Sequence, residues 1–172
     1  YVPAVNTATN ILPNCWMTEN AGAYLYYNTN GLQAPSQSHA LYLLGNGIVV
    51  LPEMGMSLSQ LMVSFHDYKA SGYGIIVGAV DITATGGLAN NFEPIDTVLF
   101  PGITNVMDVT SVLSDYTGTS SRIALKAFGS TGTGVSHYID DLTINYIPNC
   151  LAPQRVSTSF LSGYQADLHI SF

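Results

Sequence analysis

The sequence predicts an all-β fold, in the form of a jelly-roll-like antiparallel β-sandwich. Strand signals recur at short intervals along the chain, and Gly, Asn, Pro and Ser cluster between them. Helical periodicity is almost absent. Nine such segments between residues 23 and 147 are typical of two packed antiparallel sheets. An immunoglobulin-like sandwich is the alternative, but it would have fewer strands and a Trp in mid-domain, whereas Trp16 adjoins the first cysteine.

The expected strands differ in how clearly their two faces are separated. In the segment from residue 58 to residue 68, LSQLMVSFHDY, the apolar residues Leu61, Val63 and Phe65 fall on one face. This is the pattern of a strand with one face in a core. In chain order, the expected strands are 23–28, 40–44, 47–52, 58–68, 73–81, 92–100, 106–113, 122–128 and 138–147.

Composition and charge exclude several classes of protein. Only 9% of the 172 residues are charged, against about 25% in typical soluble domains, so solubility depends on neutral polar residues. The formal net charge is −7 and Lys and Arg together number four, which is not the pattern of a nucleic-acid-binding protein. No run approaches the roughly 18 apolar residues of a membrane span, so we expect no membrane insertion by this segment.

The two cysteines, Cys15 and Cys150, each follow a Pro-Asn pair and enclose nearly all of the patterned chain. Two thiols are too few for a four-thiolate zinc site, which leaves a disulfide or two free buried thiols. We favour a Cys15–Cys150 disulfide, which would stabilise the fold by at most about 5 kcal/mol through closure of this long loop. Such a bond implies an oxidising compartment, which predicts an extracellular or cell-envelope location.

The character of the sequence changes after Cys150. Pro153 marks a boundary, and two short alternating runs follow around the turn LSGYQ. These runs resemble the first two strands of a fibronectin type III module, and a two-stranded unit is marginally stable alone. We therefore expect residues 1–150 to form the sandwich domain and residues 151–172 to be the truncated start of a neighbouring module.

Several motifs taken together resemble one family. They are LPNCW near the start, IVVLPEM, VGAVDITATGGLANNFEPIDTV, the DYTG turn before RIALKAF, and YIDDLTINYIPNCLAP. In order and spacing, from Leu12 to Cys150, the set is similar to the MAM-like, choice-of-anchor J type of jelly-roll domain in Bacteroidota surface proteins, a concanavalin-like sandwich. The resemblance implies a non-catalytic accessory module that acts in adhesion, glycan handling or assembly. The chain lacks the four-cysteine pattern of animal MAM domains, so their homophilic adhesion is not implied.

Two adjacent carboxylates, Asp140 and Asp141, stand at the start of the last expected strand and match the Asp-Asp pair of the resembled family. Because alternate strand residues share a face, Asp140 should point with Leu142 and Ile144 toward a core. A buried carboxylate needs backbone N–H donors, an arginine or a cation. Two interpretations stay open: a structural anchor, or a calcium or sodium site completed by main-chain carbonyls and Glu19. Catalysis is disfavoured, because adjacent strand residues diverge and cannot flank one glycosidic bond.

Sugar hydroxyls would find hydrogen-bonding partners in the long loop between residues 81 and 96. Its candidate ligand-binding residues are Asp81, Asn90, Asn91, Glu93 and Asp96. Aromatic rings stack on the apolar faces of pyranose rings, and Tyr26 is the candidate for that role. Long loops of a sandwich either carry function or only connect strands, and both interpretations apply to this loop.

No pattern of a catalytic or cofactor site is present in the sequence. It contains no GxSxG elbow, phosphate-binding loop or HExxH helix, and its four scattered histidines indicate ordinary surface or edge residues. The sequence therefore favours a non-catalytic binding or adhesion module of a secreted or surface-anchored bacterial protein. Carbohydrate is the favoured ligand, and neighbouring modules of the same chain are expected partners. The alternative is a structural spacer in a multidomain surface protein or secreted hydrolase, and an enzyme ranks third.

Overall fold

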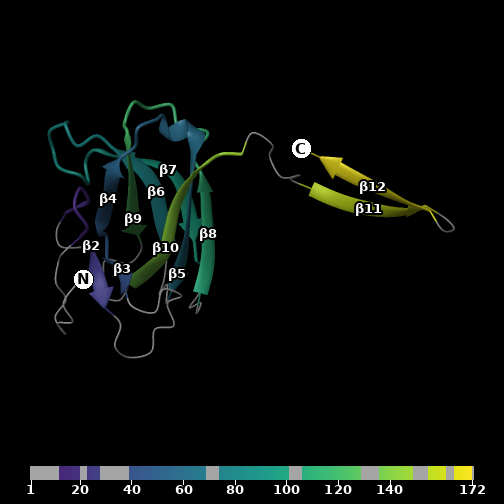
Figure 1. Cartoon of the computed structure of the whole chain (residues 1–172), viewed down its shortest axis with the longest axis horizontal. Helices are drawn as coiled ribbons and strands as arrows, with labels where there is room; N and C mark the ends of the chain where they lie inside the picture. The colour runs from purple at the N-terminus through teal and green to yellow at the C-terminus, as the bar shows by residue number, and fades with distance from the viewer. Residues whose placement is uncertain are drawn as a thin grey trace.

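The computed structural model confirms the all-β sandwich. It describes residues 12–19, 23–27, 39–68, 74–100, 106–128, 136–148, 155–161 and 165–171. Two five-stranded antiparallel sheets pack face to face, and a two-stranded hairpin follows them in the chain (Figure 1). Within these ranges the helical structure is one turn of 3₁₀-helix, Leu58–Gln60. None of the described chain forms a helix of the length and apolar character needed to cross a membrane.

Each sheet combines strands from both halves of the chain. In sheet A the order is β1–β4–β9–β6–β7, and in sheet B it is β2–β3–β10–β5–β8. The strands of sheet A are β1 Met17–Glu19, β4 Ile48–Glu53, β9 Arg122–Phe128, β6 Gly74–Val80 and β7 Phe92–Leu99. Those of sheet B are β2 Ala23–Tyr27, β3 His39–Leu44, β10 Ser136–Tyr146, β5 Leu61–Tyr68 and β8 Val106–Val112. Because β9 and β10 are the central strands, the core forms only when both halves of the chain are ordered.

All nine segments predicted to be strands are strands of the sandwich, with ends that differ by a few residues. The fourth expected strand begins later than predicted, because residues 58–60 form the 3₁₀ turn and β5 starts at Leu61. Sequence alternation missed β1, since three residues are too few to show a period of two.

The last two strands form a hairpin of their own. β11 Arg155–Leu161 and β12 Gln165–Ser171 pair antiparallel as a separate two-stranded sheet. This arrangement agrees with the two short runs expected after Pro153. That the hairpin begins a fibronectin type III module, and that a domain boundary lies near residue 150, stay predictions.

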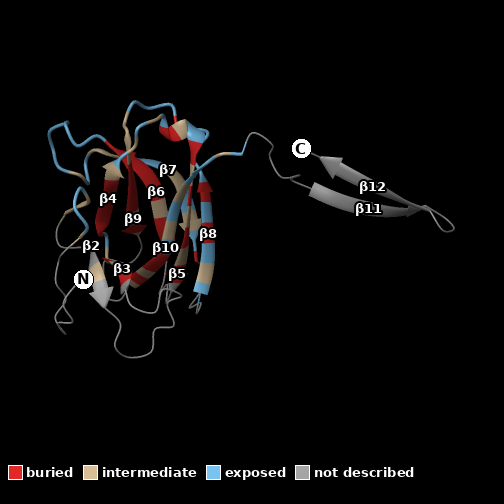
Figure 2. Cartoon of the chain, viewed as in Figure 1, coloured by how far each residue is buried: buried red, intermediate tan, exposed pale blue. Residues whose placement is uncertain are grey.

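The core lies between the two sheets and takes alternate residues from each strand. Leu61, Val63 and Phe65 of β5 are buried in it, which confirms the face predicted for that strand. From sheet A, Val49 and Leu51 of β4 belong to the same cluster. Figure 2 shows this core as the red strand segments inside the sandwich. Burying each side chain of this size stabilises the fold by about 1.5–3 kcal/mol, so the inter-sheet core is the main source of stability.

Sheet A is also apolar on its outer face. A second buried cluster, on the side that faces away from sheet B, consists of Ile48, Val50, Val80 and Ala124. Leu88, in the connection between β6 and β7, packs against this cluster. The backbone N–H of Ala89 donates to Glu19 Oε2 at 2.6 Å, so the same connection is fixed to β1 at the opposite edge of the sheet (Figure 1). The long loop is therefore a cover for sheet A.

Strand β10 reverses the phase of its side chains at a β-bulge. Its pairing with β5 is interrupted after Asp140, which lies opposite His66, and resumes at Thr143. Between them Asp141 has a φ of 50°, in the left-handed region. Because residues opposite each other share a face, Asp140 lies on the outer face with His66, whereas Ile144 packs against the core. Asp140 is nevertheless buried, 8% exposed, as expected. The prediction that it shares a face with Ile144 was wrong, since alternation does not account for an inserted residue.

A buried polar pair lies at the core side of sheet B. His137 Nδ1 is 2.6 Å from Asp67 Oδ2, and both side chains are fully buried. The other oxygen of Asp67 accepts the Tyr138 N–H at 3.2 Å, whereas His137 Nε2 has no hydrogen-bond partner among the described residues. The ring of Phe100 lies beside His137, with centroids 5.4 Å apart. The expectation of surface or edge histidines was therefore wrong for His137, whose partner is 70 residues away in sequence.

Asp67 gives the stability of the fold a specific dependence on pH. Burial raises the pKa of Asp67 above its ordinary value of 3.8, and the hydrogen bond and charge of His137 oppose that shift. The folded state therefore holds this proton more tightly than the unfolded state does. The resulting stabilisation is fully present below pH 3.8 and is lost as the pH rises through the raised pKa.

We compare the free energy of unfolding of the wild type with that of Asp67→Asn. We predict that the wild-type value minus the variant value falls as the pH rises from 3.8 through the raised pKa of Asp67. The fall is about 1.4 kcal/mol for each unit by which the pKa is raised, because the amide that replaces the carboxyl group cannot ionise. Urea unfolding at several pH values measures it, with Asp115→Asn as the control because that residue is exposed. A difference that is constant or rises with pH would contradict the assignment.

Candidate ligand-binding pocket

A polar pocket opens at the end of sheet A where β4 and β6 end and β9 begins. Its volume is about 330 Å³. The lining residues are Glu53, Val80, Asp81, Ile82, Thr83, Thr119, Ser120, Ser121 and Arg122. We call it the Arg122 pocket. Because β9 lies between β4 and β6, the sheet brings together three chain segments that are far apart in sequence.

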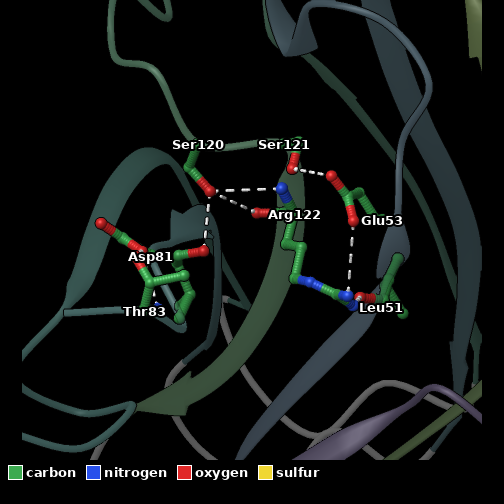
Figure 3. A network of polar contacts seen from close by, with 8 residues as sticks. Leu51, Glu53, Asp81, Thr83, Ser120, Ser121 and Arg122 are labelled. Carbon is green, nitrogen blue, oxygen red and sulfur yellow. Dashed lines mark hydrogen bonds and ion pairs between the residues drawn. The ribbon is translucent and has the colours of Figure 1, made fainter.

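Arg122 is the cation of this pocket, and its side chain is 15% exposed. One N–H of its guanidinium donates to the carbonyl of Leu51 at 3.2 Å, and Nη2 lies 3.8 Å from Glu53 Oε2 (Figure 3). The hydroxyl of Ser121 donates to the other oxygen of Glu53 at 3.1 Å. A guanidinium has five N–H donors, so several of them have no partner among the described residues. Because Arg122 lines the pocket, those donors are candidates for hydrogen bonds to a ligand.

Ser120 is fixed in place by four contacts. Its hydroxyl donates to the carbonyl of Val80 at 2.7 Å and accepts the Arg122 N–H at 3.2 Å (Figure 3). It also lies 3.5 Å from the carbonyl oxygen of Arg122. Its backbone N–H donates to the hydroxyl of Tyr116 at 2.9 Å. Burial raises the pKa of Tyr116, so this phenol stays protonated at neutral pH. Tyr116 is therefore a positioning residue for the wall of the pocket.

Asp81 is the acid at the outer rim of the pocket. Its Oδ1 accepts the backbone N–H of Thr83 at 2.8 Å and the Thr83 hydroxyl at 2.6 Å. The Thr83 hydroxyl and then the Thr83 N–H lower the pKa of Asp81, because both stabilise the carboxylate. Asp81 is therefore ionised at neutral pH and acts as a hydrogen-bond acceptor there.

The other candidate residues of the 81–96 loop do not line this pocket. The amide of Asn90 donates to the carbonyl of Gly86 at 2.6 Å, and that of Asn91 donates to the carbonyl of Ala84 at 2.9 Å. Both amides thus hold the loop together from within. Glu93 and Asp96 lie on β7, at the edge of sheet A. Of the five residues predicted for this loop, the structure brings only Asp81 into the pocket.

The candidate cation ligands do not come together. Glu19 lies on β1 in sheet A, where it accepts the Ala89 N–H, whereas Asp140 and Asp141 lie on β10 in sheet B. Asp140 Oδ1 accepts the Asp141 N–H at 2.9 Å, and Asp141 Oδ2 is 3.8 Å from His66 Nε2. Within the described ranges, no group of three or more His, Cys, Asp or Glu is arranged to hold a metal. A calcium or sodium ion at Asp140 or Asp141 stays a prediction.

Two predicted features fall partly outside the described residues. Cys15 is an exposed, free thiol in a turn with a φ of 71°, and Cys150 lies outside the described ranges. The Cys15–Cys150 disulfide stays a prediction. The backbone of Tyr26 pairs with Ala40 in sheet B, and the side chain of Tyr26 is not among those described. Its stacking role also stays a prediction.

Most of the pocket was missed by sequence analysis. Glu53 and Arg122 belong to β4 and β9 and are 69 positions apart, and no local motif connects them. One signal was available in the sequence. Arg122 is one of only four basic residues in the chain, and it begins a strand directly after two serines.

Comparison with known proteins finds solved structures that have a similar fold. No protein-family model matches the sequence, and no curated protein sequence matches it significantly. The K1 cleaved adhesin domain of Lys-gingipain from Porphyromonas gingivalis is similar in structure, with a TM-score of 0.53 and 15% identity over 80% of this chain and 94% of that one. The K2 cleaved adhesin domain of Lys-gingipain gives a TM-score of 0.54 and 11% identity over 77% and 89%. The chain therefore shares their β-sandwich fold.

We predict that Gly118→Ala destabilises the fold by about 1–3 kcal/mol, because overpacking displaces neighbouring side chains. An added Cβ at Gly118 would lie 2.6 Å from Tyr116 Cζ and 2.7 Å from its Cε2, which is too close for carbon atoms. The matched control is Gly55→Ala, in the β4–β5 connection, where an added Cβ meets nothing within 4 Å. Urea unfolding measures both variants. Equal stability of the two would contradict the role of Tyr116 in holding this wall.

Proposed function

We propose that the chain is a non-catalytic carbohydrate-binding module and that the Arg122 pocket holds a sugar unit of its ligand. The observation that carries the proposal is the convergence of a guanidinium, two carboxylates and several hydroxyls on one concave site of about 330 Å³. Such a volume lies at the lower end of the range for small-molecule sites, about 300–1,000 Å³. This volume suits one sugar unit at the end, or on a side branch, of a polysaccharide.

The chemistry of the pocket matches adjacent hydroxyls of a sugar. Each hydroxyl is a donor and an acceptor at once, so a pair of them can donate to Glu53 or Asp81 and accept from Arg122. Hydrogen bonds to charged groups contribute about 1.5–3 kcal/mol each, more than bonds between neutral groups. A free anion is disfavoured, because the carboxylates outnumber the single cation. A neutral glycan is therefore the proposed ligand.

The groups in the pocket suit binding and not bond cleavage. Glycoside hydrolysis needs one carboxyl group with a raised pKa as the general acid. The hydrogen bonds from Thr83 lower the pKa of Asp81, so it cannot hold a proton for that purpose at neutral pH. The hydroxyl of Ser120 already donates to the carbonyl of Val80, and no histidine lines the pocket.

The proposal includes a secreted or surface-anchored bacterial protein as the parent of this module, with neighbouring modules of the same chain as partners. The two similar structures are adhesin domains, and the shared fold supports a role in attachment. The low proportion of charged residues also suits a surface that contacts neutral polymers. The MAM-like relationship and the fibronectin type III neighbour belong to this proposal.

We predict that Arg122→Gln weakens binding by roughly 10- to 100-fold, because it removes charge-assisted hydrogen bonds to the sugar. A glycan array identifies the ligand, and calorimetry on the strongest neutral oligosaccharide measures the affinity. Glu53→Gln, which keeps the shape of the side chain, should also weaken binding. Lys126→Gln is the matched control, because Lys126 lies on the same strand but its ammonium group sits over the Phe92 ring, 5.3 Å from the centroid.

Thermal melting of every variant separates lost binding from lost folding. Unchanged affinity in both pocket variants would contradict the assignment of the site. If the folded wild type bound no plant, host or microbial polysaccharide, the carbohydrate proposal would fail and the structural spacer would replace it.

A further inference from the structure

A second pocket opens at the same end of the sandwich, on the side of sheet B. Its volume is about 620 Å³. Its lining residues are Ser59, Gln60, Ser114, Tyr146, Ile147 and Pro148. We call it the Tyr146 pocket. The lining residues come from the turn before β5, the segment after β8 and the end of β10. These three strands are neighbours in sheet B, with β5 in the middle.

The two pockets share their supporting segments. The connection from β4 to β5 leaves the Arg122 pocket at Glu53 and supplies Ser59 and Gln60 to the Tyr146 pocket. The connection from β8 to β9 supplies Ser114 to the Tyr146 pocket and Ser120 to the Arg122 pocket. Both connections cross the upper end of the sandwich in Figure 1. The pockets are therefore at the same end of the domain.

Main-chain hydrogen bonds fix the walls of the Tyr146 pocket. The N–H of Ile147 donates to the carbonyl of Gln60 at 2.9 Å, which ties the end of β10 to the start of β5. The N–H of Leu113 donates to the carbonyl of Leu61 at 3.0 Å, which ties β8 to the same strand. Leu58, fully buried, anchors the 3₁₀ turn beneath. The pocket is therefore preorganised by three strands.

The lining of this pocket combines an open aromatic ring with neutral polar groups. Tyr146 is 65% exposed, the highest value among the large hydrophobic residues of the described chain. The side-chain amide of Gln60 has no hydrogen-bond partner among the described residues, and the hydroxyl of Ser59 is 2.8 Å from that of Ser57. No charged residue lines the pocket. Ile147 and Pro148 extend the apolar surface beside the ring.

We infer that the Tyr146 pocket is a second sugar-binding subsite, which takes a neutral pyranose unit through ring stacking on Tyr146 and hydrogen bonds to Gln60. The apolar C–H face of a pyranose matches an exposed phenol ring, and its hydroxyls match an unpaired amide. A charged ligand finds no counter-charge here. This inference rests on the proposed function, and it adds that one module binds two sugar units at the same end.

Calorimetry on the full chain tests the inference, with the neutral oligosaccharide and the polysaccharide that bind most strongly. Tyr146→Ala should lower the affinity for the polysaccharide about tenfold, which corresponds to the loss of one ring contact. Tyr146→Phe should bind almost as the wild type, because it keeps the ring and removes only the hydroxyl. The matched control is Leu99→Ala, which is 64% exposed and lies at the opposite end of sheet A.

The stoichiometry for the short oligosaccharide distinguishes the outcomes. Binding of two oligosaccharide molecules by each wild-type chain, and of one by each Tyr146→Ala chain, would support the second subsite. Unchanged binding by Tyr146→Ala, together with lost binding by Arg122→Gln, would overturn the second subsite and leave the proposed function standing. If Tyr146→Ala lost binding and Arg122→Gln did not, the Tyr146 subsite would be supported and the assignment of the Arg122 pocket as a sugar site would be rejected. No binding by the folded wild type would overturn both.

Discussion

Burial of sheet A on both faces is the constraint around which the molecule is arranged. Successive residues of β4 pack on opposite faces of the sheet. Val49 belongs to the core between the sheets, and Val50 belongs to the outer cluster. A strand of this kind is stable only if another part of the chain removes its outer face from water. The β6–β7 connection does this with Leu88, and Glu19 fixes that connection by accepting a backbone N–H. A long loop that resembles a binding rim in sequence is thus committed to packing.

Most of the fold was predictable because runs of strand-forming residues are separated by turn residues, and because strands such as β5 also have unlike faces. The alternation of Leu61, Val63 and Phe65 predicted both the strand and its buried side. The phase of Asp140 was not predictable, since a single residue with positive φ, Asp141, reverses the strand and leaves no mark in the pattern. Nor was β1, which is too short to alternate.

The candidate pocket was less predictable than the fold, because it depends on sheet order. Glu53 and Arg122 become neighbours only when β9 pairs with β4, and alternation does not specify which strands pair. Asp81 was found because it ends a recognisable strand and begins a long loop. Glu53, Arg122 and Tyr146 stand at the ends of paired strands, whereas the other polar residues of the two pockets lie on the connections between strands.

The bulge in β10 also determines how this domain responds to mechanical tension. β3 pairs with β10 only from Ser136 to Ile139, whereas β5 pairs with it as far as Tyr146. A pull on the chain through Pro148 therefore loads four consecutive pairs on one side of β10, from Tyr146 back to Thr143, before it reaches the bulge. Beyond the bulge, Tyr138 and Ile139 are paired on both sides, so separating them requires breaking contacts to β3 as well as to β5. Moderate force would open the Tyr146 pocket end while the central part of the sandwich stays closed.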